Sequence, residues 1–135
     1  MIEVDTRGLI SAFDDWVKQT NKDAEKAFRA MCLQLFAGIV GRTPVDTGRL
    51  RGNWQISLNN PVAGVLDRTA SPTAEERSKL DAANVGTSVY LHNNLPYAER
   101  IEFYNHSQQS PNGMVRVTLT EFEQALRRAA QEASR

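Results

Sequence analysis

Apolar residues between Arg7 and Val40 recur at intervals of three, four and seven positions, which is the spacing of one face of an α-helix. Thr20–Asn21 interrupts the apolar content without shifting its phase, so the pattern predicts one long helix, bent at that point. At the usual rise per residue this helix would extend about 50 Å, and part of it would project from a small domain. Gly41 predicts its end. The stripe consists of Ile10, Phe13, Val17, Ala24, Phe28, Met31, Leu35 and Ile39.

Apolar and polar residues alternate in three later segments, which predicts strands at residues 53–58, 87–93 and 114–119. In the first of these segments, Trp54, Ile56 and Leu58 share one face. After the third, Thr120 and Glu123 stand in the register of a capping box, which predicts the start of a terminal helix. The apolar face of that helix consists of Phe122, Leu126, Ala129 and Ala133.

Two segments carry little apolar content and are rich in proline, glycine and polar residues: residues 59–86 and residues 105–113. The longer one contains a weak helical pattern at residues 74–83, with Thr73 and Glu76 in capping-box register. Connections of this length in a compact domain are usually functional or disordered. We expect both segments to order on contact with a partner, because their composition buries little apolar surface.

The order of these elements predicts a single α+β domain over residues 1–135. A long N-terminal helix and a C-terminal helix would pack on a small antiparallel β-sheet, with long loops between them. A chain of 135 residues that is 41% hydrophobic and 24% charged is typical of one soluble globular domain. No apolar run approaches the ~18 residues of a membrane span, and the N-terminus lacks the pattern of a signal peptide. Cys32, the single cysteine, lies in an apolar helical stretch and is expected to be a buried, unreactive thiol.

The segment "TPVDTGRLRGNW", Thr43 to Trp54, combines turn-forming residues with arginines. A phosphate-binding P-loop is excluded, because six residues separate Gly41 from Gly48 and the predicted order is helix then strand. Pro44 presets φ, Asp46 can accept a bond from a backbone N–H two residues on, and Gly48 permits a positive φ. These features predict a tight corner between the helix and the first strand, with Arg49 and Arg51 at the beginning of that strand.

Nucleic-acid binding is the alternative interpretation of the corner. Arg42, Arg49 and Arg51 would contact phosphates while Trp54 stacks on a base. Sixteen basic and sixteen acidic residues give a net charge of zero, and proteins that depend on phosphate contacts usually carry a basic excess. Trp54 also falls in phase with the apolar face of its strand, which favours a position in the core.

The catalytic candidates are sparse. His92 and His106 lie fourteen positions apart, with Asn93 beside the first, but no acidic residue stands at metal-ligand spacing. We expect His92 in a strand and His106 in a loop. Glu99 and Glu102 are three apart and are expected to form ion pairs with arginines. The sequence therefore predicts no catalytic residue, metal site or cofactor, and no enzymatic activity.

The segment "TPVDTGRLRGNW", which ends at Trp54, is followed along the chain by "VYLHNNLPYAERIE", residues 89–102. Together these two segments resemble the tail-component family of tailed bacteriophages, whose members are also described as tail-completion or head–tail joining proteins. The resemblance extends over roughly residues 8 to 133. The matching positions are Pro44, Val45, Asp46, Thr47, Gly48, Arg49 and Leu50 in the first segment, and Asn93, Tyr97, Ala98 and Glu102 in the second.

The resemblance implies a structural virion protein that completes the head-proximal end of a siphophage-like tail and helps to join the tail to the head or neck. The implied partners are further copies of the chain, in a ring of six, and other neck, tail-terminator or tail-tube proteins. It implies assembly in the host bacterial cytoplasm, with no cofactor, membrane or small-molecule substrate. The alternative is a nucleic-acid-binding phage accessory protein. We also expect Arg49 to pair with Glu102, since both match the family motifs.

Overall fold

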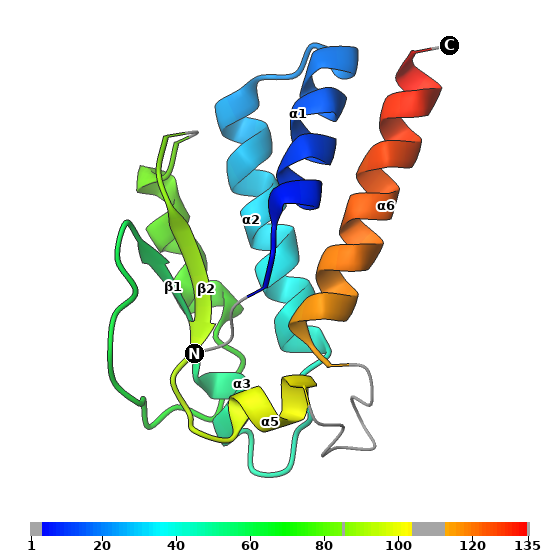
Figure 1. The fold of residues 1–135 in the computed structure, drawn as a ribbon. Coiled ribbons are helices and arrows are strands. Elements are labelled where there is room, and N and C mark those ends of the chain that lie inside the picture. Colours follow the sequence, from blue (N-terminus) through cyan, green and yellow to red (C-terminus); the bar gives the residue numbers. More distant parts are fainter. Residues whose placement is uncertain (1–3, 85, 104–112, 135) are drawn as a thin grey trace.

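Three long helices and a two-stranded sheet dominate the fold of the computed structural model, which describes residues 4–84, 86–103 and 113–134 (Figure 1). The long helices are α1 (Arg7–Thr20), α2 (Ala24–Gly41) and α6 (Val115–Ala133), and the antiparallel strands are β1 (Trp54–Leu58) and β2 (Val89–Asn93). The short helices are α3 (Arg49–Gly52), α4 (Thr73–Glu76), the 3-10 helix η1 (Arg77–Ala82) and α5 (Ala98–Phe103). The predicted α+β class, with long terminal helices and an antiparallel sheet, is confirmed.

The N-terminal region is a helical hairpin, so the prediction of one long helix is wrong. Asn21 ends α1 in the left-handed conformation, with φ 52°, and Asp23 caps the start of α2. The Asp23 carboxylate accepts hydrogen bonds from the amides of Glu25 and Lys26 at 3.0 and 3.1 Å. The two helices run side by side in opposite directions (Figure 1). No part of this region projects as a single 50 Å rod would.

The predicted third strand is also wrong, because residues 115–119 form the first turns of α6. Met114, Val115 and Thr118 are buried at helical spacing, and the Thr118 hydroxyl donates to the Met114 carbonyl at 2.6 Å. Thr120 and Glu123 therefore lie inside the helix, and the predicted capping box there is wrong. The sheet of the described residues consists of β1 and β2 alone.

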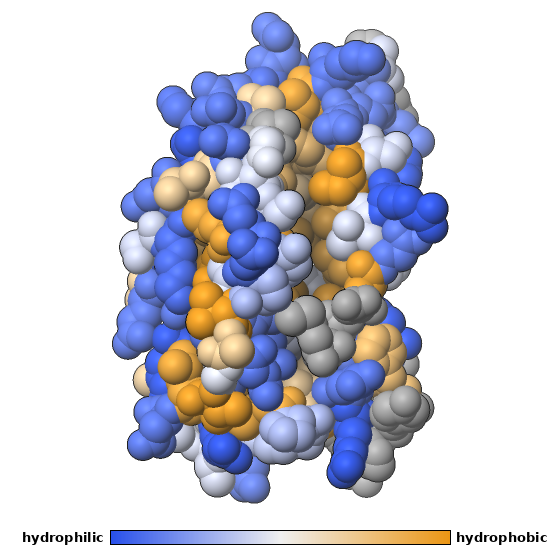
Figure 2. Space-filling view, turned by 60° about the vertical axis from the view of Figure 1, so that its left-hand side comes forward, coloured by the Kyte–Doolittle hydropathy of each residue, from blue (hydrophilic) through white to orange (hydrophobic). Residues whose placement is uncertain are grey.

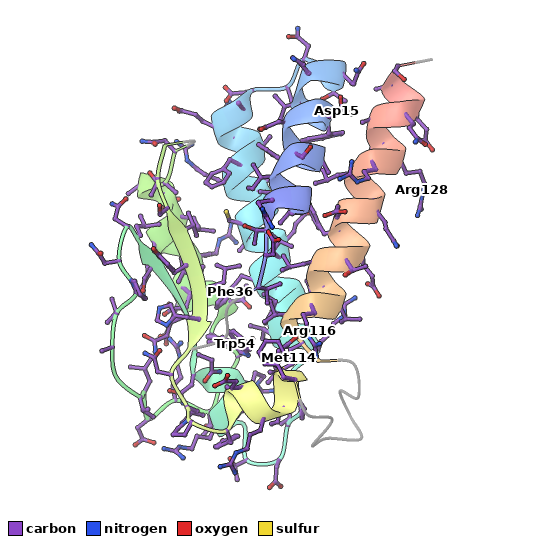
Figure 3. The ribbon with its side chains drawn as sticks, in the orientation of Figure 1. Asp15, Phe36, Trp54, Met114, Arg116 and Arg128 are labelled. Carbon is purple, nitrogen blue, oxygen red and sulfur yellow. The ribbon has the colours of Figure 1, made fainter. Side chains whose placement is uncertain are left out.

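Two apolar clusters hold the layers together. The larger cluster lies between α2, the sheet and η1, and its largest fully buried side chains include Trp54, Phe36 and Ile39. Figure 3 shows Phe36 and Trp54 between α2 and the sheet. The smaller cluster joins α1, α2 and α6. The first two predicted strands are confirmed as β1 and β2. The predicted end of the helix at Gly41 is also confirmed.

The connection between β1 and β2 is packed on the domain. Its predicted helical piece is present as α4 and η1, and Leu80 and Ala83 belong to the larger core cluster. The premise that this segment buries too little apolar surface to order alone is therefore wrong for residues 72–83, whereas residues 59–67 are exposed. The predicted capping box also fails, because Thr73 is the first residue of α4 and caps nothing with its side chain. Of the second predicted loop, residues 105–112 lie outside the described part of the chain.

Candidate functional site

The two segments that carry the family resemblance meet in space, and we call their contact, between residues 43–54 and residues 93–102, the motif junction. Trp54 and Asn93 are directly paired across the sheet. The Asn93 side-chain amide donates to the Leu50 carbonyl at 2.8 Å, and its oxygen accepts from the Leu95 amide at 3.1 Å. Asn93 is 3% exposed, so both bonds are shielded from water. One side chain thus fixes the end of β2 against α3.

Trp54 is completely buried at the motif junction, as its phase in the strand predicted. Its indole N–H donates to the Thr43 hydroxyl at 2.8 Å, and that hydroxyl donates to the Ile39 carbonyl at 2.7 Å. The bonds join the end of α2 to the start of β1. A buried indole cannot stack on a base, so the stacking role considered for Trp54 is wrong.

The corner before β1 turns at Gly48, which has the predicted positive φ, 90°. A Cβ atom at this position would lie 2.5 Å from the Thr69 carbonyl oxygen, so glycine also permits a close backbone approach. Arg49 and Arg51 belong to α3 rather than to a strand, because the Gly52 amide bonds back to the Gly48 carbonyl at 2.8 Å in a helical turn. Within the turn, the Thr47 hydroxyl accepts from the Arg49 amide at 3.2 Å.

Other matching positions of the two segments are divided between surface and core. Asp46, Thr47 and Arg49 are exposed, and Pro44 is partly buried. Leu50 and Ala98 belong to the larger core cluster, and Tyr97 packs against it. The motif therefore supplies both core contacts and an exposed rim of polar side chains.

Glu102 is a buried carboxylate that caps α6 from outside the helix. One carboxylate oxygen accepts from the amides of Met114 and Val115 at 2.7 and 2.6 Å, and the other accepts from the Arg116 amide at 3.0 Å. The Arg116 guanidinium Nε also lies 3.0 Å from that second oxygen. Figure 3 shows Met114 and Arg116 at the end of α6 that faces α5. A negative charge at this place stabilises the helix, whose first amides are otherwise unpaired.

The expected pair between Arg49 and Glu102 is wrong, because both oxygens of Glu102 are engaged by α6. Glu102 is 1% exposed, whereas Arg49 lies on the surface. Arg116 also stacks over the Phe103 ring, 4.7 Å from its centroid. No sequence pattern marks this contact, although it explains Gly113, where a Cβ atom would lie 2.5 Å from a Glu102 carboxylate oxygen.

Sequence reasoning also missed a charged pair that covers the outer edge of β1. Arg68 donates to the carbonyls of Gly52 and Trp54 at 2.7 and 2.9 Å, and Glu76 accepts from the Ile56 amide at 2.8 Å. Arg68 and Glu76 are joined at 3.0 Å, and Lys79 adds a second bond to Glu76 at 2.7 Å. Burial alone raises the pKa of Glu76, but hydrogen bonds from Lys79, the Ile56 amide and Arg68 outweigh it and lower the pKa. The pair occupies backbone groups that a neighbouring strand would otherwise bond.

The predicted strand position of His92 is confirmed, and the side chain is buried beneath the connection. Its Nε2 lies 2.7 Å from the Ser57 hydroxyl, and its Nδ1 lies 3.2 Å from the Asn94 side-chain oxygen. Burial lowers the pKa of His92, which favours the neutral ring. The Ser57 hydroxyl also accepts from the Val62 amide at 3.1 Å and is 4% exposed. The arrangement holds a loop in place and offers no accessible nucleophile. His106 lies outside the described residues.

Cys32 is 5% exposed, which confirms that it is buried, and burial raises the pKa of its thiol to about 11, which disfavours the reactive thiolate. The residues that the structure describes contain no group of three or more His, Cys, Asp or Glu placed to hold a metal ion. Within the same ranges, no helix has the length and apolar content to cross a membrane.

Comparisons of this chain with protein-family models, with curated proteins and with solved structures gave no match. The geometry itself describes a rigid junction in which buried polar side chains bond backbone groups of neighbouring elements. Such an arrangement can position surfaces for assembly.

Proposed function

We propose that this chain is a structural virion protein of a tailed bacteriophage. It would complete the head-proximal end of the tail and help to join the tail to the head or neck, as a ring of identical copies. Its partners would be other neck, tail-terminator or tail-tube proteins, and its place would be the virion, after assembly in the host cytoplasm.

One observation carries the proposal: the two motif segments, some forty residues apart, are joined by the Asn93 side chain on the Leu50 carbonyl. The residues that prompted the resemblance therefore form one structural unit, which supports the proposal. The buried polar side chains of the motif junction bond groups of the chain itself, as the side chains of a structural protein do. The predicted projecting helix gives no support, because residues 7–41 form two helices, α1 and α2, joined by a turn.

The experiment is to inactivate the gene in a phage that encodes this chain and to examine the products by electron microscopy. We expect DNA-filled heads and separate or defective tails, with DNA replication unchanged. Supplying the protein in trans should restore joined particles. Normal joined particles together with blocked replication would overturn the proposal in favour of a nucleic-acid-binding accessory protein.

The arginines of the corner give little support to the alternative of nucleic-acid binding, because two of them bond groups of the chain itself. Arg42 bonds the Thr118 hydroxyl at 3.2 Å and pairs with Glu121, and Arg51 donates to the Thr69 carbonyl at 2.8 Å. Together with the buried indole of Trp54, these contacts leave Arg49 as the exposed arginine of α3.

A further inference from the structure

The two edges of the sheet differ in how their backbone groups are bonded. At the outer edge of β1, Arg68 donates to the Trp54 carbonyl at 2.9 Å, and Glu76 accepts from the Ile56 amide at 2.8 Å. At β2, no hydrogen bond from outside the sheet reaches the backbone of residues 89–91 within the described part of the chain. One edge is therefore occupied by charged side chains, and the other edge is open.

The register of the sheet places the unbonded groups of β2 on its outer edge. Leu91 lies opposite Ile56, and Val89 lies opposite Leu58. The Ile56 amide donates to Glu76, away from β2, so its pair with Leu91 is a non-hydrogen-bonded pair of the antiparallel ladder. The alternation of such pairs makes Leu58 and Val89 the next one. Val89 and Leu91 consequently direct their N–H and C=O groups away from β1.

Open edges of sheets are normally protected by charged side chains, by proline or by a covering element, because they otherwise pair with other chains. Residues 82–98, which contain β2, include no Asp, Glu, Lys or Arg in a chain that is 24% charged, and Pro96 follows the strand. Among the elements of the described chain, β1 is the one that packs closely along β2. The strand β1 is equally free of charged residues, but Arg68 and Glu76 supply charges at its edge. In the described residues, only β1 has this protection.

The side chains of Val89 and Leu91 belong to the apolar face of the sheet. Both are partly buried, and both pack against the larger core cluster. Figure 1 shows β1 along one side of β2. Figure 2, which turns the sheet side of the molecule forward, shows hydrophobic residues interspersed among hydrophilic ones there. A strand added at the open edge would continue the sheet and extend its apolar face.

We propose that β2 of one copy pairs with β2 of a second copy, in antiparallel orientation about a two-fold axis at Leu91. In this register the amide and carbonyl of each Leu91 bond those of the other, and each Val89 pairs with Asn93 of the second copy. The product is a sheet of four strands, which is a usual size, whereas the described part of one copy has two. The contact uses the same surface on both copies and is therefore isologous.

A second copy is the occupant that the structure favours. Because Arg68 and Glu76 occupy the edge of β1, strand pairing between copies can use only β2 with β2, and it stops at a dimer. In the proposed register no charged residue of one β2 stands opposite another, and like charges in that position would be destabilising. Leu91 of one copy meets Leu91 of the other on the apolar face.

The inference goes beyond the proposed function and does not rest on it. A two-fold contact ends in a closed pair, so it cannot by itself build a ring of six copies. A ring in the virion would need a second contact, between two different surfaces of the chain. Failure of either proposal therefore leaves the other standing.

Hydrogen exchange, measured over a range of protein concentrations, tests the contact on the full chain. The Leu91 amide points to the open edge, whereas the amides of Tyr90 and His92 point to β1 and serve as internal controls. We expect the protection of Leu91 to rise with the dimer fraction measured by sedimentation equilibrium. The amides of Tyr90 and His92 should be protected already in the monomer.

Two variants at one position separate the backbone bond from the side chain. Val89→Pro removes the amide that faces the second copy, and proline is tolerated there because Val89 begins the strand and its N–H points away from β1. Val89→Ala shortens the same side chain and keeps the amide. We expect the dimer dissociation constant of Val89→Pro to exceed that of Val89→Ala about tenfold or more, because the two-fold axis removes the bond twice.

A charge at the edge provides an independent test if Val89→Pro fails to fold. Tyr90→Lys places like charges diagonally across the two-fold axis, and Tyr90→Gln is its uncharged control. The lysine variant should dimerise more weakly than the glutamine variant at low salt. The difference should shrink at high salt, because ions screen the repulsion between exposed charges.

Three results would overturn the inference. A chain that stays monomeric at every concentration does not pair with itself. Equal protection of the Leu91 amide at all concentrations would mean that the edge is covered within a single copy. A dimer that dissociates alike in Val89→Pro and Val89→Ala would use another surface.

Discussion

Two buried glutamates, Glu76 and Glu102, each accept hydrogen bonds from backbone amides at the edge of another element, and their charges are compensated by different means. Glu76 occupies an amide at the edge of β1 and is surrounded by the cations of Arg68 and Lys79. Glu102 occupies three amides at the start of α6 and has one cation, Arg116. The Glu76 carboxylate accepts from a β1 amide that a neighbouring strand would otherwise bond. The Glu102 carboxylate accepts from the first amides of α6, as an N-cap side chain would. A buried charge can thus be compensated by side chains or by backbone groups, and the two cases should respond differently to mutation.

The largest effect is expected from Glu102→Ala, which leaves three amides and a guanidinium without their acceptor. We expect the free energy of unfolding to fall by about 3–5 kcal/mol, measured by urea denaturation. Glu99→Ala, an exposed change on the same short helix, is the matched control and should stay within about 0.5 kcal/mol of wild type. Equal losses in the two variants would mean that Glu102 does not cap α6.

A smaller loss is expected from Glu76→Ala, about 1–3 kcal/mol. Arg68 keeps its bonds to the Gly52 and Trp54 carbonyls, and the Lys79 side chain is 45% exposed, so water can replace part of what is lost. Glu75, whose pair with Arg68 lies at the surface, supplies the control: Glu75→Ala should cost at most about 1 kcal/mol. A greater loss of unfolding free energy in Glu76→Ala than in Glu102→Ala would mean that compensation by backbone amides contributes less to stability than compensation by side chains.

The smallest expected effect is a local loss of stability at low pH, and it comes from the buried His92. The pKa of His92 is lowered by burial, so the open or unfolded state takes up a proton more readily. The stability contributed by the neutral ring is present above the usual pKa of 6.5 and is lost as the pH falls below it. Hydrogen-exchange protection of the Val62 and Leu66 amides should therefore fall between pH 7 and pH 5.

The amides of Val115 and Arg116, which bond Glu102, should keep their protection over the same range. His92→Gln should remove the pH dependence of hydrogen exchange at the Val62 and Leu66 amides. A parallel loss of protection in both regions would indicate global unfolding instead of a local effect of His92.

The elements that could be predicted from the sequence depend on local signals. The alternation around Trp54 predicts β1 and its buried face, and the Asp-Thr-Gly turn predicts the positive φ of Gly48. The turn at Asn21 was missed because its residues suit a bent helix as well, and the apolar phase happens to continue across it. The left-handed Asn21, the Asp23 cap and the apolar cluster that α1 and α2 share with α6 decide in favour of the turn.

The start of α6 could not be predicted, because a contact distant in sequence overrides the local propensity. Residues 114–119 alternate and are rich in β-branched side chains, which favours a strand by local propensity. The deciding group is the Glu102 carboxylate, twelve residues before Met114, and no local pattern records that contact. Likewise, the anchoring of the connection by Arg68 and Glu76 follows from tertiary packing, so composition alone suggested a loosely ordered segment.

The pairing of the first helix with the last has a consequence for synthesis on the ribosome. The α1–α2 hairpin is local in sequence and can form as soon as residue 41 has emerged. Its partner, α6, is synthesised after all the other described elements, and Leu126 completes the apolar cluster that Leu9 and Phe13 begin. Until then the hairpin exposes apolar surface, and transient exposure of this kind promotes aggregation of nascent chains. Chains truncated before residue 115 should accordingly depend on chaperones that bind apolar surface.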